Sequence, residues 1–168
     1  MITMTIEELF EVGTNFESSV GYGSKSERSR IPKNYSRINL TEEMIKTLTE
    51  FDKEVNFLVS GEIWCPDYQL NITVLKKFTE LNPNLNISVI SMSRGKKFLP
   101  PILGVSEFKW PMVIVLDKDF NILGTFEERP KSVKSIENFE DIKLDYYKGK
   151  YLLDSASEFL EIMNTAKY

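Results

Sequence analysis

The residue best placed to do chemistry in this sequence is its only cysteine, Cys65. It follows an apolar run and precedes Pro66, where helical spacing of apolar residues begins. A helix start offers unpaired backbone N–H groups and positive partial charge, so we expect the Cys65 thiol pKa to fall below the free value of about 8.5. Pro66 suits a first helical position, and Trp64 offers a flat apolar surface for a peptide. The sequence therefore predicts a reactive thiol.

The lack of histidine and the single cysteine exclude several other kinds of site. They rule out Ser-His-Asp and Cys-His nucleophile pairs, histidine ligation of zinc or haem, four-cysteine clusters and an internal disulfide. Asp117 to Glu128 resembles a calcium loop, but Ile122 stands where glycine makes the sharp turn. Gly21 to Ser26 does not complete a phosphate-binding motif. We therefore expect no metal and no cofactor.

Length and composition indicate a soluble globular protein. The chain has 168 residues, a length that predicts one domain. Its 42% hydrophobic residues can form a buried core, and its 27% charged residues can form a solvent-exposed surface. A net charge of −4 does not favour nucleic acid. No apolar run approaches the roughly 18 residues of a membrane span, and residues 1–8 do not resemble a signal peptide. We expect a cytoplasmic protein that binds neither nucleic acid nor membranes, with its thiol reduced.

Residues 1–52 are predicted to form a helical extension ahead of the first strand. A capping-box pattern and apolar residues at helical spacing predict a helix over about 5–17. Residues 20–38 lose this spacing and contain two glycines, four serines, a proline and five basic side chains, so we interpret them as a basic loop. A second helix is expected to start near Thr41, because acidic residues and an apolar face follow it.

Residues 53–168 are interpreted as the core, which completes a single α/β domain over 1–168. The last two strands are joined by a short turn and should form an antiparallel hairpin. Residues 127–150 are charged and mixed, and no firm element is predicted there. The expected order is β-α-β-α-β-β-α, with strands at 55–59, 87–90, 112–116 and 121–126, a helix from Pro66 to about 81, a connection over 94–104 and a closing helix with a capping box at Ser155.

The segment Trp64 to Tyr68 reads Trp-Cys-Pro-Asp-Tyr and resembles the redox motif of the thioredoxin superfamily, most closely the thioredoxin-like branch with Trp-Cys-Pro-Asp-Cys. The resemblance extends over most of the chain, including the Trp110-Pro111 junction and Gly149 to Leu152 before the last helix. It implies a thioredoxin-like three-layer sandwich around a mixed central sheet. It also implies that Cys65 is the nucleophile and that Pro111 follows a cis bond and lies against the active thiol.

Tyr68 stands where this branch has its second cysteine, and this departure decides the mechanism. In a dithiol enzyme the second sulfur resolves the mixed disulfide formed by the first. Here any exchange must be monothiol, completed by glutathione, another low-molecular-weight thiol or a partner protein. Val59 lies where many thioredoxins have a buried acid, so proton transfer would need Asp67, the Tyr68 hydroxyl or water.

Each of these residues also has a purely structural interpretation. Cys65 is also compatible with a buried apolar cysteine, although its place at a helix start favours the reactive thiol. Tyr68 is compatible with core packing, although its hydroxyl could instead hydrogen-bond the thiolate. Asp67 suits a helix start, where its charge would oppose a lowered thiol pKa. Trp64 and Trp110 are compatible with partly buried anchors.

Two functional hypotheses follow. In the first, Cys65 performs monothiol exchange or thiol capture with protein or low-molecular-weight thiols and disulfides. In the second, the chain is a redox-inactive module that holds a peptide or protein in a groove formed by Trp64, Trp110 and Pro111. The predicted catalytic residues are Cys65 and Pro111. The predicted substrate-binding residues are Trp64, Pro66, Asp67, Tyr68 and Trp110.

Overall fold

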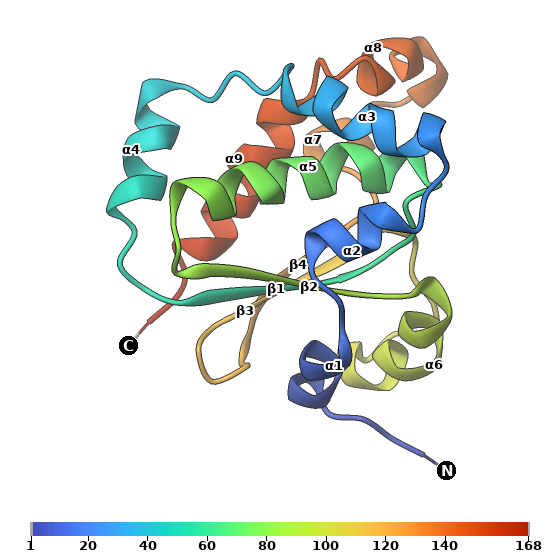
Figure 1. Ribbon diagram of the computed structural model, residues 1–168, viewed down its shortest axis with the longest axis vertical. Coiled ribbons are helices and arrows are strands. Elements are labelled where there is room, and N and C mark those ends of the chain that lie inside the picture. Colours follow the sequence, from blue (N-terminus) through green and yellow to red (C-terminus); the bar gives the residue numbers. More distant parts are fainter. Residues whose placement is uncertain (1, 168) are drawn as a thin grey trace.

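A mixed sheet forms the centre of the computed structural model, which describes residues 2–167 (Figure 1). Met1 and Tyr168, the two ends of the predicted domain, lie outside the described residues. The strands are β1 (Val55–Ser60), β2 (Leu85–Ile90), β3 (Met112–Leu116) and β4 (Ile122–Glu127). They lie in the order β2-β1-β3-β4, with β1 parallel to β2 and antiparallel to β3, and with β3 antiparallel to β4. The predicted hairpin is therefore present.

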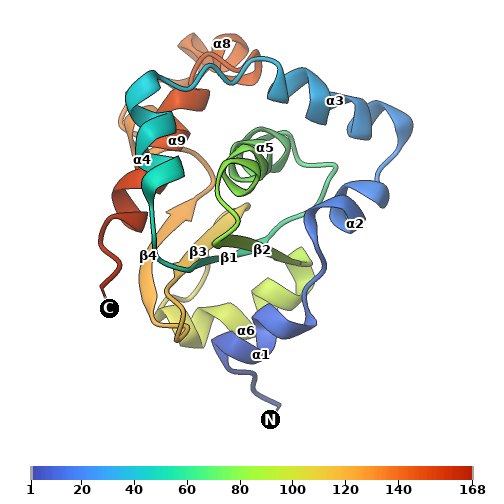
Figure 2. The ribbon, with the colours of Figure 1, turned by 60° about the vertical axis from the view of Figure 1, so that its left-hand side comes forward.

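Helices cover both faces of the sheet, which confirms the predicted three-layer α/β sandwich around a mixed sheet (Figure 2). On one face lie α5 (Pro66–Leu81), α9 (Leu152–Met163) and α4 (Glu42–Glu50), and on the other lie α1 (Ile6–Val12) and α6 (Met92–Leu103). All six residues of β1 are buried, because this central strand has a covered face on each side. Each face has its own cluster of buried apolar side chains.

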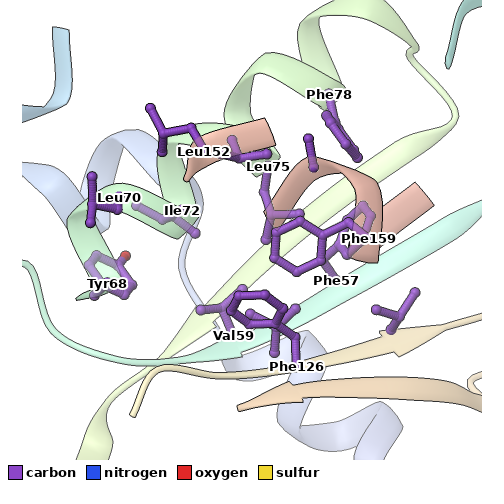
Figure 3. Close-up of a cluster of buried hydrophobic side chains, with 14 of the residues drawn as sticks. Phe57, Val59, Tyr68, Leu70, Ile72, Leu75, Phe78, Phe126, Leu152 and Phe159 are labelled. Atoms are coloured by element: carbon purple, nitrogen blue, oxygen red, sulfur yellow. The ribbon is translucent and has the colours of Figure 1, made fainter. Parts of the chain in front are cut away.

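Aromatic rings join α5 and α9 to the sheet (Figure 3). The ring of Phe159 on α9 lies 6.2 Å from that of Phe57 on β1, 6.2 Å from that of Phe78 on α5 and 4.5 Å from that of Phe126 on β4, measured between ring centroids. All four side chains are fully buried. Burial of such large rings stabilises this layer strongly and holds α5, which carries the motif, against the strands.

The single helix expected over 5–17 is wrong, because the chain leaves the helix to pair with the sheet. After α1, Thr14 forms an antiparallel bridge with Val89 of β2, and each backbone N–H donates to the other's carbonyl at 2.8 Å. A second helix, α2 (Phe16–Gly21), follows. The outer edge of β2 offers unpaired backbone groups, and the bridge satisfies some of them.

The basic loop expected over 20–38 is also wrong, because most of it is helix α3 (Lys25–Tyr35). Ser24 and Glu27 form a capping box: the Ser24 hydroxyl accepts from the Glu27 N–H at 3.2 Å, and the Glu27 carboxylate accepts from the Ser24 N–H at 2.8 Å. The helix buries little apolar surface, which is why its periodicity is weak. Between residues 2 and 52 the chain thus forms four helices rather than two.

Residues 127–150, for which no firm element is predicted, contain three short helices after β4. These are α7 (Lys131–Lys134), the 3₁₀ helix η1 (Phe139–Asp141) and α8 (Lys143–Tyr147). The closing helix α9 begins at Leu152, before the predicted capping box. Ser155 makes a different bond, donating from its buried hydroxyl to the side-chain Oδ1 of Asn71 at 2.6 Å.

Candidate functional site

Cys65 is the cap residue of α5, as the sequence predicts. The chain passes from the end of β1 through a short loop to Cys65, and Pro66 is the first residue of the helix. The backbone N–H groups of Asp67 and Tyr68 face the sulfur and lower its pKa, although the Cys65 side chain makes no capping hydrogen bond. The helix end therefore acts on the thiol through a weak electrostatic attraction.

Burial nevertheless raises the pKa of the Cys65 thiol, so the expected lowering is wrong. The residue is 9% exposed and belongs to the hydrophobic cluster on the α5 side of the sheet. Loss of hydration disfavours the thiolate, and the negative charges of Asp67 and Glu128 raise the pKa further. Together these effects outweigh the attraction of the two amides. The thiol is therefore mostly protonated at neutral pH.

The peptide bond between Trp110 and Pro111 is cis, and it lies at the end of the sheet from which the Cys65 loop departs. Ser60, the last residue of β1, pairs with Met112, the first residue of β3. The Trp110 indole N–H donates to the Ser60 hydroxyl at 3.3 Å, across the same strand ends. The structure thus brings the Trp110-Pro111 junction to the end of the sheet that carries the motif.

The two tryptophans differ in their surroundings. Trp110 is partly buried, and its ring lies 5.0 Å from that of Phe108 between centroids, which fits an anchoring role. Trp64 is 57% exposed, so it is not the partly buried anchor that its structural interpretation supposes. Pro66 is exposed as well. Trp64 and Pro66 therefore form the solvent-facing part of the motif, on either side of Cys65.

Tyr68 points into the core, away from solvent. Its predicted contact with a substrate is therefore wrong. The Tyr68 side chain is fully buried, and its hydroxyl lies 2.7 Å from the hydroxyl of Ser19 on α2. The Ser19 proton is already donated to the Phe16 carbonyl at 2.8 Å, so Tyr68 is the donor to Ser19. Burial raises the pKa of Tyr68. The hydroxyl is thus neither a partner of the thiolate nor a proton source at neutral pH.

Asp67 lies behind the motif in a network that sequence reasoning missed. Its carboxylate pairs with Arg129 at 3.0 Å and accepts from the Tyr147 hydroxyl at 3.2 Å. The Arg129 guanidinium stacks 3.8 Å above the centre of the Phe139 ring. Asp67 is 6% exposed, so it does not contact a substrate directly. It fixes the first turn of α5 to the segment after β4 and places a negative charge near Cys65.

A family model described as thioredoxin matches residues 13–145. The chain belongs to the thioredoxin family. A solved structure of a protein of unknown function from Pseudomonas aeruginosa is similar, with 30% identity and a TM-score of 0.91 over 99% of this chain and 100% of that one. An HIV epitope scaffold is similar at 31% identity, with a TM-score of 0.91 over 98% and 100% of the two chains. No curated protein matches the chain.

Within this thioredoxin-family chain, the site consists of an exposed surface and a supporting layer. Trp64 and Pro66 are exposed, Cys65 lies between them with 9% of its surface exposed, and the buried Asp67 and Tyr68 support them from behind. Among residues 2–167, no group of three or more acidic or cysteine side chains is placed to hold a metal ion. In the same part of the chain, every helix is too short or too polar to cross a membrane.

Proposed function

We propose that this thioredoxin-family protein attacks substrate disulfides with Cys65 and captures one half of each as a mixed disulfide, from which an external thiol then releases Cys65. The observation that carries the proposal is the position of the sulfur. It lies at the N-terminal end of α5, facing two backbone amides and flanked by the exposed Trp64, at the end of the sheet where the cis Trp110-Pro111 bond lies. The partners are low-molecular-weight or protein thiols and disulfides. A cytoplasmic location would keep Cys65 reduced between reactions.

The chemistry consists of two exchange steps. In the first, the Cys65 thiolate attacks a substrate disulfide, one new S–S bond forms, the substrate S–S bond breaks, and one substrate thiolate leaves. In the second, the thiolate of an external thiol attacks the mixed disulfide and expels Cys65 as its thiolate, so the captured group departs joined to the external thiol. Each step exchanges one S–S bond for another, with no net change in electrons.

The raised pKa of Cys65 favours capture over rapid turnover. Only the thiolate attacks, so a raised pKa leaves fewer reactive molecules at neutral pH. A thiol of higher pKa is also a poorer leaving group, so expulsion of Cys65 in the second step is slow. Because Tyr68 supplies no second sulfur, nothing within the chain accelerates that step. A long-lived mixed disulfide is the expected result.

Intact-mass spectrometry tests this proposal directly. The native chain is incubated with glutathione disulfide at pH 8 and quenched in acid. We expect one glutathionyl adduct per chain, which glutathione then removes, and no adduct on Cys65→Ser. Because Cys65 is the sole cysteine, an adduct identifies its own site. If the folded chain stays unmodified while the urea-unfolded chain is labelled in the same time, thiol capture is wrong.

A redox-inactive binding module is the second candidate function, and the raised thiol pKa together with the 57% exposed Trp64 favours it. Such a module would hold a peptide against Trp64 without electron transfer. Cys65→Ser separates the two functions. Partners that remain bound to Cys65→Ser but are lost from Trp64→Ala support the module, whereas loss of all partners from Cys65→Ser supports capture.

A further inference from the structure

A small cavity of about 230 Å³ opens next to Pro66, one residue from the reactive cysteine. Its lining residues come from α3, the first turns of α5 and the end of α8. Helices α3 and α8 lie on the side of α5 that faces away from the sheet (Figures 1 and 2). Four of its six lining residues are polar or charged. The lining residues are Arg30, Asn34, Pro66, Gln69, Leu70 and Tyr147.

Two buried carboxamides in this lining have unused hydrogen-bonding capacity. Asn34 is 5% exposed, and its side-chain amide has no hydrogen-bond partner within residues 2–167. Gln69 is 2% exposed and donates its N–H to the Ile63 carbonyl at 2.7 Å, which leaves its carbonyl oxygen without a partner in the same range. No unpaired side-chain nitrogen or oxygen among these residues is wholly inaccessible, so the free atoms of Asn34 and Gln69 keep contact with solvent, and both residues line this cavity.

The cavity also has a free positive charge at its rim. Arg30 is exposed on α3 and forms no ion pair with any described residue. Helix α3 carries four basic side chains and one acidic one, although the whole chain has a net charge of −4. An arginine fork beside a carboxamide donor matches a carboxylate. The unpaired Gln69 oxygen can accept a hydrogen bond from an N–H donor close to that carboxylate.

We infer that this cavity binds the carboxylate and neighbouring amide N–H of the thiol that Cys65 captures. The inference rests on the proposed function and names its substrate class: small N-acylated cysteine compounds, in which a carboxylate, an amide N–H and the sulfur lie within one residue. Arg30 and Asn34 donate to the carboxylate, and the Gln69 carbonyl accepts from the N–H. The side chain of the ligand then extends past Pro66 toward Cys65.

Binding can be measured without any reaction at Cys65. The probe is N-acetyl-S-methyl-L-cysteine, a thioether that cannot form a disulfide, titrated into the ¹⁵N-labelled native chain and followed by NMR. We expect the side-chain NH₂ signals of Asn34 and Gln69 to shift in a saturable manner. Because a charged hydrogen bond is lost in each case, we expect about tenfold weaker binding for the primary amide of the probe and for Arg30→Gln.

Matched variants separate the pocket from general charge effects. Lys33→Gln removes the same charge from the same helix, but Lys33 does not line the cavity, so it should leave the affinity unchanged. Asn34→Asp should abolish binding, because it sets one carboxylate against another. If neither NH₂ signal shifts, or if the acid and its amide bind equally, the inference is wrong. A failure of thiol capture appears separately, as a missing adduct in the mass assay.

Discussion

Restoring the second cysteine of the motif by Tyr68→Cys should destabilise the protein severely. The side chain is fully buried, its ring packs against Gly61, and its hydroxyl donates to Ser19. Loss of most of a buried aromatic ring costs about 3 kcal/mol, and loss of the hydrogen bond adds about 1 kcal/mol. Tyr68→Phe removes the hydrogen bond alone and should cost about 1 kcal/mol.

Urea unfolding followed by far-UV circular dichroism, with a reductant present, measures these free energies. For a chain of this length 1 kcal/mol corresponds to roughly 3 °C in Tm, so we expect Tm to fall by about 3 °C for Tyr68→Phe and by about 12 °C for Tyr68→Cys. Tyr22→Phe is the matched control, because Tyr22 is 79% exposed and should change the stability by less than about 0.5 kcal/mol. Ser19→Ala should make Tyr68→Phe nearly neutral in a double-mutant cycle.

Two results would refute this reasoning. If Tyr68→Cys unfolds at the same urea concentration as the native chain, Tyr68 is not the core residue described above. At a temperature where both chains are folded, Tyr68→Cys should reduce insulin disulfides while the native chain does so poorly. Equal activity of the two chains would contradict the monothiol mechanism.

Three further predictions concern the surroundings of the thiol. Alkylation of Cys65 by iodoacetamide should keep accelerating above pH 8.5, because its pKa is raised; a plateau below that pH contradicts the burial argument. Asp67→Asn should lower the Cys65 pKa, seen as faster alkylation at pH 8, and an unchanged pH profile would count against this. The same substitution should cost about 2 kcal/mol in urea unfolding, because the partly buried Arg129 guanidinium loses the nearer of its two carboxylate partners. Gly61→Ala should cost about 2 kcal/mol by the same unfolding assay, because its methyl group would overlap the ring of Tyr68, and full stability would mean that the ring can move aside.

The central part of the fold was predictable from the sequence because its signals are local. The buried run of β1, the change of period at Pro66 and the pair of strands around the 117–120 turn each indicate one element. Helix α3 was missed because Ile31 is its sole buried apolar side chain, so the usual stripe is lacking. The capping box at Ser24 and Glu27 was the available signal.

The position of the thiol was predictable, but the direction of its pKa shift was not. A helix start can be located from Pro66, and the amides that face Cys65 follow from it. Burial and the charge of Glu128 depend on how distant segments pack. Arg129 reaches Asp67 from 62 residues further along the chain, and nothing near the motif indicates that pairing.

The bridge between Thr14 and Val89 has a consequence for the solubility of shortened chains. β2 is an outer strand of the sheet, and the two backbone hydrogen bonds between Thr14 and Val89 occupy part of its free side. A chain that began at β1 would leave that side open, and an open strand edge is a template for pairing with another copy. We therefore expect chains shortened to begin at β1 to aggregate more readily than the full chain.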